Sequence, residues 1–332
     1  MLSIILHADD FGLNAAVTGG ILQGFADGLL TSTSLLANAP DAPRAIEEWK
    51  DLATRHAAGV LPSAPVRDGI DDARQPWDFG IHLNLTQGRP LTGDKYPAAL
   101  LDAAGRFPGI YRLFRLLRGR NKKYRAPVEA ELAAQIALLS DHSIRPTHLN
   151  GHQYVELLPP IAELLPDLMA RFAIPVLRVA VEPALARTTL WRNVRLGAWI
   201  LAHVKQRYAR KLRARVAGRA ALSPRRFFGT AHAGRIDART FEAFLTAAGN
   251  TGVIEIGMHP GLANRRISLR ALDDGWNDPL ATGRPHELAL LQSPALAERL
   301  RARNARLGRL AQLGACAPSR RDATHTPKRT AA

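Results

Sequence analysis

Residues 2–12 read Leu-Ser-Ile-Ile-Leu-His-Ala-Asp-Asp-Phe-Gly, and this stretch decides the expected fold. An apolar run with a β-branched pair leads into two adjacent carboxylates, Asp9 and Asp10, and then into a glycine that permits a sharp turn. The pattern predicts a buried strand over residues 3–8 that ends in polar side chains. Asn14 follows as a helix cap, so a helix is expected over residues 15–27.

Outward from this stretch, the same alternation of strand and helix continues along the chain. Further strands are predicted at residues 30–36, 79–85, 147–150, 175–180 and 253–257. Helices are predicted at residues 42–53, 128–140, 160–172, 241–248, 287–292 and 295–313, whereas 59–76 is a loop and 91–124 is irregular. The alternation predicts an α/β fold, either a parallel sheet or a (β/α) barrel of the TIM type.

Three histidines follow other predicted strands in the way that Asp9 and Asp10 follow the first. They are His82, His152 and His259. Any one of them alone is more often a structural histidine. Because barrel active sites form at the carboxyl ends of the strands, the set together favours a site. One Asp and two His would bind a divalent ion, and the remaining Asp and His would serve as general base and general acid. Zn²⁺ suits such ligands, and Mg²⁺ or Mn²⁺ with added waters remains open.

Other polar residues near these strands have weaker interpretations. His7 and His148 lie within strands, where they could orient a ligand. The run at residues 31–34 and Asn38 could hydrogen-bond a polyhydroxylated substrate, or could simply be strand residues. Two adjacent carboxylates after a buried strand need compensation, from a metal on one and a proton or imidazolium near the other.

The composition indicates a globular protein with an uneven, strongly basic charge. The chain has 332 residues and a formal net charge of +16, and residues 187–226 hold twelve Lys or Arg and no Asp or Glu. Residues 112–125 and 299–309 are further basic stretches. An anionic partner would explain this asymmetry, and so would a solvated Arg-rich surface. The single cysteine, Cys316, excludes an intramolecular disulfide framework and a Cys-based zinc cluster.

The basic insertion at about residues 183–226 contains Trp191, Trp199 and Tyr208 among apolar residues. Its apolar part is too short to span a bilayer, but it could lie at the surface of an anionic membrane. An ordinary helix packed on the barrel is the alternative. With no signal peptide and no long apolar run, a cytoplasmic protein is expected, with peripheral contact at the inner membrane face as an option. Residues 1–314 are expected to form one domain, and 315–332 a disordered tail.

Five motifs, in order along residues 1–262, resemble the YdjC-like carbohydrate deacetylases, the family of ChbG and HpnK. They are His-Ala-Asp-Asp-Phe-Gly at 7–12, Leu-Thr-Ser-Thr-Ser at 30–34, Gly-Ile-His-Leu-Asn-Leu-Thr-Gln-Gly-Arg-Pro-Leu at 80–91, Pro-Thr-His-Leu-Asn-Gly-His-Gln at 146–153 and Glu-Ile-Gly-Met-His-Pro-Gly at 255–261. The resemblance implies a deformed barrel that removes the N-acetyl group from an N-acetylglucosamine-type sugar on a hopanoid glycolipid or a chito-oligosaccharide.

The resemblance also implies a role for each residue of the candidate site. Asp10, His82 and His152 would bind the metal, Asp9 would be the general base and His259 the general acid. The family pattern continues with two further histidines where this chain has Tyr154 and Glu156, which puts substrate contacts on that rim in doubt. The basic insertion is closer to the HpnK branch. The alternative function is a non-catalytic sugar- or lipid-binding relative. No nucleic-acid partner is expected, and a homodimer is compatible with the sequence.

Overall fold

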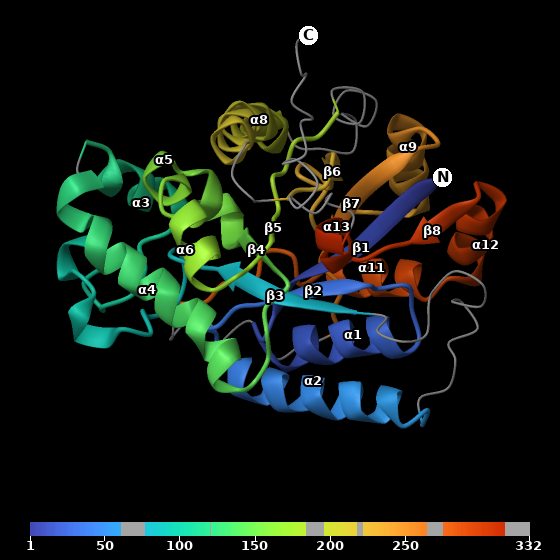
Figure 1. The fold of residues 1–332 in the computed structure, drawn as a ribbon, viewed down its shortest axis with the longest axis horizontal. Helices are drawn as coiled ribbons and strands as arrows, with labels where there is room; N and C mark the ends of the chain where they lie inside the picture. The colour runs from blue at the N-terminus through green and yellow to red at the C-terminus, as the bar shows by residue number, and fades with distance from the viewer. Residues whose placement is uncertain (61–76, 120, 184–195, 218–221, 264–274, 316–332) are drawn as a thin grey trace, which may run out of the picture.

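The computed structural model describes residues 1–60, 77–119, 121–183, 196–217, 222–263 and 275–315 (Figure 1). The strands are β1 (Leu2–Phe11), β2 (Ser32–Leu35), β3 (Asp78–Leu83), β4 (His148–Gly151), β5 (Val176–Leu177), β6 (Arg226–Phe228), β7 (Gly252–Met258) and β8 (Ala305–Leu307). The α-helices are α1 (Ala15–Ala26), α2 (Ala42–Ala57), α3 (Ile110–Leu117), α4 (Asn121–Asp141), α5 (Pro159–Ala162), α6 (Leu165–Arg171), α8 (Leu196–Val216), α9 (Ala238–Ala248), α11 (Arg284–Leu291), α12 (Pro294–Ala302) and α13 (Ala311–Ala315). The 3-10 helices are η1 (Gly93–Lys95), η2 (Ala98–Leu100) and η3 (His152–Leu157).

All strand pairs of the described sheet are parallel, and β1 is an interior strand that pairs with three others. The order is β5-β4-β3-β2-β1-β7-β6, with β8 pairing the first residues of β1. The register runs from Leu2 opposite Gly252 to Ala8 opposite Met258. Because β1 has neighbours on both sides and packing on both faces, nearly every one of its residues is buried, as expected for a continuous apolar strand of a parallel sheet.

Backbone hydrogen bonds join the two ends of this sheet. Leu177 N donates to Leu222 O at 2.9 Å, and Phe227 N donates to Val181 O at 3.1 Å. The segment from β5 to Val181 therefore contacts the segment from Leu222 to β6. The sheet curls into a deformed (β/α) barrel, and the predicted fold class is confirmed.

An aromatic cluster fills the space between β1, β3 and the first two helices. Trp49 of α2 contacts Phe11, Phe25 and Phe79 at ring-centroid distances of 6.3, 5.3 and 4.5 Å. In Figure 1 these helices lie below the sheet, whereas α8 lies above it. The cluster packs α1 and α2 against β1 and β3.

Several predicted elements were wrong at their boundaries. The stretch 91–124, predicted to be irregular, contains α3 and the first residues of α4. Helix α3 starts after Gly109 and buries Leu113 and Leu117, which are four residues apart on one face. The helix predicted over residues 295–313 is instead α12, β8 and α13. Asn304 takes a left-handed backbone (φ 49°), which ends the helix and starts the strand.

Helix α8 forms most of the described part of the predicted basic insertion and is fixed to the barrel. The Gln206 amide donates to Ala180 O and accepts from Glu182 N, both at 2.9 Å. Arg213 donates to the carbonyls of Pro224 and Arg225 at 3.0 Å. Residues 184–195, with Trp191, and the predicted tail from residue 316 lie outside the described residues. Among the helices that are described, none is long and apolar enough to cross a membrane.

Candidate active site

The five site residues predicted from sequence line one cavity of about 570 Å³ at the carboxyl ends of the strands. Asp9 and Asp10 come from β1, and His82 from β3. His152 directly follows β4, and His259 directly follows β7. The structure therefore brings all five together, from four parallel strands, at the edge where a barrel places its functional groups.

A distortion of β1 explains how two consecutive aspartates reach the same cavity. In a regular strand neighbouring side chains point to opposite faces. The pairing of β1 with β2 shifts register between Ala8 and Phe11, and Asp10 takes a left-handed backbone with φ 70°. Such a bulge redirects a side chain, so that both carboxylates line the cavity.

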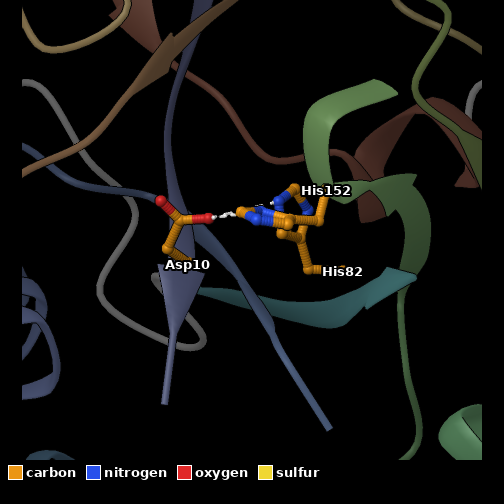
Figure 2. A group of neighbouring side chains, drawn as sticks. All are labelled: Asp10, His82 and His152. Carbon is orange, nitrogen blue, oxygen red and sulfur yellow. Dashed lines mark hydrogen bonds and ion pairs between the residues drawn. The ribbon is translucent and has the colours of Figure 1, made fainter. Parts of the chain in front are cut away.

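Asp10, His82 and His152 form a compact group of metal-ligand type (Figure 2). One ligand atom from each lies within 4.8 Å of the others. Asp10 Oδ1 is 3.0 Å from His152 Nδ1 and 3.4 Å from His82 Nε2. His152 Nε2 is buried without a hydrogen-bond partner. One carboxylate oxygen with two imidazole nitrogens suits a divalent ion such as Zn²⁺, so the residues fit the metal that the sequence predicted.

Asn150 sets the orientation of His82. Its Oδ1 is 2.8 Å from His82 Nδ1, and its amide nitrogen donates to Asp9 Oδ1 at 2.9 Å. Since the amide oxygen can only accept, Nδ1 of His82 carries the proton and Nε2 turns its lone pair toward Asp10. Burial lowers the pKa of His82, but Asp9 and Asp10 together raise it by more.

Arg178 holds Asp9 in its ionised form. Its Nη1 donates to both oxygens of Asp9, at 2.7 and 2.8 Å, and its Nε donates to Glu255 Oε1 at 2.7 Å. Burial raises the pKa of Asp9, but the Arg178 guanidinium and the neighbouring histidines lower it by more, so it lies well below its ordinary value. Asp9 is thus a carboxylate at neutral pH.

Arg284 holds Asp10 in its ionised form, as Arg178 does for Asp9. Its Nη2 donates to Asp10 Oδ2 at 2.7 Å, and its Nε donates to Asp278 Oδ2 at 2.8 Å. Burial raises the pKa of Asp10, but Arg284 and the two histidines lower it well below its ordinary value. The two arginines supply the charge compensation that the adjacent carboxylates require, whereas the sequence analysis expected it from a metal, a proton or an imidazolium.

His259 lies beside Asp9 and close enough to Asp10 to feel its charge. Its Nε2 is 3.7 Å from Asp9 Oδ2, and its backbone N–H donates to Glu287 at 2.6 Å. Burial lowers the pKa of His259, although Asp10 and Asp9 partly offset this. The imidazole is therefore neutral at pH 7, with one ring nitrogen toward the base and Nδ1 without a hydrogen-bond partner.

The weaker sequence interpretations have different outcomes. His7 is 3.2 Å from Asp9 and hydrogen-bonds Ser32 and Ser34, so it supports the predicted base rather than a metal ligand. The residues of the run 31–34 are fully buried and Asn38 bonds the carbonyls of Gln87 and Arg89. These side chains serve the fold, and none of them lines the cavity.

The cavity walls come from two helices that the sequence did not connect. Ile110, Tyr111 and Phe114 of α3 and Leu201, Val204, Lys205 and Tyr208 of α8 are among the lining residues. Phe114 and Tyr208 meet edge to face with centroids 6.4 Å apart. The basic insertion is therefore a wall of the site. Tyr154, one of the two residues that depart from the family pattern, also lines the cavity, with the Lys205 ammonium 3.9 Å from its ring centroid.

Sequence reasoning missed Arg178, Arg284, Asn150 and Glu255. A signal existed for two of them, because Arg178 and Glu255 are charged residues inside apolar strand-like runs. Arg284 lies in a loop-like Gly-Arg-Pro context that carries no such signal. Its place beside Asp10 depends on how α11 packs against the end of β7.

A curled parallel sheet with an Asp-His-His group and a second Asp-His pair at its carboxyl ends defines an α/β barrel with a candidate metal-dependent active site. The YdjC-like protein family matches residues 3–302, and the chain belongs to that family.

Curated relatives of the chain are named carbohydrate deacetylase. The protein of Geobacillus stearothermophilus is 31% identical over 172 residues, which span 52% of this chain and 58% of that relative. The human protein is 27% identical over 319 residues, 90% of this chain and 87% of the relative. A crystal structure from Enterococcus faecalis V583, of a protein provisionally described as a cellobiose-phosphate cleavage protein, has a TM-score of 0.68 at 20% identity. It covers 94% of this chain and 98% of its own, and shows the shared fold.

Proposed function

We propose that the protein is a metal-dependent deacetylase that removes the acetyl group from an N-acetylated amino sugar. The observation that carries this proposal is the convergence, in one cavity, of the Asp10-His82-His152 group with Asp9 and His259. The names of the curated relatives support it. The alternative, a binding protein without catalysis, would have no use for an acid-base pair beside the metal-ligand group.

In this proposal Asp9 and His259 carry the proton through the reaction. A divalent ion held by Asp10, His82 and His152 would supply Lewis acidity for water and for the acetyl carbonyl. Asp9 accepts the proton of the attacking water, and the resulting hydroxide adds to the acetyl carbon. The neutral imidazole of His259, 3.7 Å from Asp9, can then receive that proton and give it to the leaving amine nitrogen. The C–N bond breaks, and the products are acetate and the free amine.

The test is acetate release from N,N′-diacetylchitobiose and from an N-acetylglucosaminyl lipid, each with and without a chelator. We expect release that stops on chelation and returns when Zn²⁺ or Mg²⁺ is added. Release that a chelator leaves unchanged would contradict the metal dependence. Binding of a metal without release from either substrate would favour the binding protein.

The cavity walls favour a substrate with an apolar aglycone. Above the polar floor the lining is mainly aliphatic and aromatic, from α3 and α8. A sugar binds through hydroxyl groups and an occasional aromatic face, whereas α3 and α8 contribute mainly aliphatic and aromatic side chains to the cavity. A glycolipid, of the hopanoid kind that the resemblance to the HpnK branch implies, would place its sugar on the floor and its apolar part between the helices. A chito-oligosaccharide is the alternative.

The same two helices form a proposed contact with an anionic membrane. Ile200, Val204, Arg207 and Lys211 are exposed and recur at helical spacing on one stripe of α8. Across the mouth of the cavity, Tyr111 is 70% exposed beside the arginines of α3. Neither helix contains an acidic residue. Apolar tips among cations suit an anionic lipid surface, from which a glycolipid could enter the cavity.

Sedimentation with vesicles tests the membrane contact. Binding to phosphatidylglycerol vesicles should exceed binding to phosphatidylcholine vesicles and fall with added salt. Each basic residue near an anionic surface contributes about 1 kcal/mol, so Arg207→Glu with Lys211→Glu should weaken binding more than about tenfold. Arg299→Glu with Arg306→Glu, in the third basic stretch, is the matched control and should retain most of the binding. Equal losses in both pairs would contradict a specific surface.

A further inference from the structure

Asp9 and Asp10 are chemically identical neighbours in one cavity, yet the proposed reaction needs one to bind an ion and the other to accept a proton. The β1 bulge brings both to the histidines. His82 Nδ1 is 4.0 Å from Asp9 Oδ1, and His82 Nε2 is 3.4 Å from Asp10 Oδ1. Position along the chain does not by itself separate the two roles, so their surroundings must do so.

Both carboxylate oxygens of Asp9 already accept hydrogen bonds. Arg178 Nη1 donates to both of them, and Asn150 donates to Oδ1 at 2.9 Å. Arg178 is itself held by Glu255, and all of these side chains are buried. An ion at Oδ1 would have to displace one of these buried hydrogen bonds, which are among the strongest polar contacts in proteins when an arginine donates. At Oδ2 a proton can still be accepted, but a divalent ion would lie close to the Arg178 guanidinium and be repelled by it.

Asp10 is held through one oxygen only. Arg284 donates to Oδ2 at 2.7 Å, and the arginine is fixed in turn by Asp278. Oδ1 faces His152 and His82 and receives no contact from either arginine. This carboxylate therefore presents to the two imidazoles one oxygen that no arginine hydrogen-bonds.

We propose that Arg178 and Arg284 are positioning residues that divide the roles of the adjacent aspartates. Arg178 keeps Asp9 off the metal and available as the base, and Arg284 limits Asp10 to one ligand oxygen. The inference rests on the metal site of the proposed function. It adds what the ligand set alone does not explain, namely why Asp10 and not Asp9 is the ligand.

The test measures Co²⁺ binding, by competition with a chelator and by visible absorption, and requires no substrate. Arg178→Gln with Glu255→Gln removes the arginine contact with Asp9 without changing the net charge. Asp9 should then join the ion, so Co²⁺ affinity should rise at least about tenfold, at 1.4 kcal/mol per tenfold change, and the absorption spectrum should change. Adding Asp9→Asn to this pair should abolish both effects. In the parent protein Asp9→Asn should leave the spectrum unchanged. Arg303→Gln with Glu242→Gln, a surface ion pair, is the charge-matched control.

A second variant at Arg178 keeps the test valid if the double variant does not fold. Arg178→Lys retains the charge, but its single nitrogen cannot hydrogen-bond Asp9 and Glu255 as Nη1 and Nε do together, so it should shift the spectrum in the same direction by a smaller amount. Arg284→Gln with Asp278→Asn should change the spectrum whether or not Asp9 is present, because it frees Oδ2 of Asp10.

The outcomes separate the inference from the proposed function. If Asp9→Asn changes Co²⁺ affinity by the same factor with and without Arg178, the coupling between them is zero and the division of roles is overturned. If the parent binds no Co²⁺, or binds it equally well after His82→Ala, the metal site of the proposed function falls and the inference with it.

Discussion

Asp10 has the backbone of a residue that is not in a regular strand, and this one conformation makes the site possible. A left-handed backbone costs a non-glycine residue of the order of 1 kcal/mol, and such conformations persist where the surroundings hold them. Here the contact with Arg284 and the bulge against β2 hold Asp10 in place. The strain keeps two neighbouring carboxylates on one side of the strand.

Asp9→Asn should reduce kcat by about a hundredfold to ten-thousandfold while the protein retains its metal. The amide cannot accept the proton of water, and general-base catalysis contributes about 10²–10⁴-fold. Acetate release and metal analysis on the same sample measure the two effects. Asp51→Asn, on the exposed side of α2, is the control. Loss of metal together with activity would instead make Asp9 a ligand.

His82→Ala and His152→Ala should each lower metal affinity by several orders of magnitude, because each removes one of three protein ligands. Equilibrium dialysis against Zn²⁺ measures this. His142→Ala, a half-exposed histidine outside the cavity, is the control and should bind metal as the parent does. Unchanged affinity in either site variant would refute its assignment as a ligand.

At the level of single residues, sequence could predict which side chains come together in the cavity but not the residues that hold them in place. Asp9, Asp10 and the three histidines stand at strand ends, where residue type and position together carry the signal. Arg178 and Arg284 lie 169 and 274 residues from their aspartates along the chain. Only the packed barrel brings these groups together, and no local pattern records it.

The elements that sequence predicts poorly are those that form only because of tertiary contacts. The long strands β1, β3 and β7 were found because their apolar runs are continuous. β8 has three residues and exists because it pairs Leu2–Ile4 of β1, and β6 is as short. The start of α4 was missed because Pro127, normally a helix-breaking residue, lies within that helix.

Asp78, at the start of β3, links this strand to α13 and should make stability depend on pH. Its carboxylate accepts from Ala311 N at 3.2 Å, and burial raises its pKa to about 7. The folded state therefore favours the protonated form. Stability from this group is full below the unfolded pKa of about 4 and is lost as the pH rises through 7, by at most about 4 kcal/mol.

Asp78→Asn should remove this dependence. The variant should gain stability over the parent at pH 8.5 and gain less at pH 5.5. Urea unfolding at the two pH values, followed by far-UV circular dichroism, measures the difference. An equal difference at both pH values would show that Asp78 does not titrate in this interval.

On the scale of the whole molecule, the charge and the architecture act together. The two longest basic stretches, far apart in sequence, meet at the mouth of one cavity through α3 and α8. The sequence analysis recorded both stretches but could not place them on the same face. Only the fold brings the two basic segments to the same cavity.

The last strand should contribute to global stability because it pairs the central one. Leu307→Ala in β8 should lower the free energy of unfolding by about 2–4 kcal/mol, the usual cost of a buried Leu→Ala change. Arg306→Ala, exposed on the same strand, is the matched control and should change it by less than about 0.5 kcal/mol. Hydrogen exchange at Ser3 and Ile4 should accelerate only in the first variant. Equal exchange in both would make β8 an independent, frayed end.

The position of β1 has a consequence for biosynthesis. Strand β1 is translated long before two of its partners, since β7 and β8 follow it by about 250 and 300 residues. During most of translation an apolar segment therefore has one open edge, which invites pairing with other nascent chains. We expect slow completion of the barrel, because sheet contacts of such sequence separation form late. The yield of folded protein in a cell should then depend more on chaperone capacity than on the stability of the finished molecule.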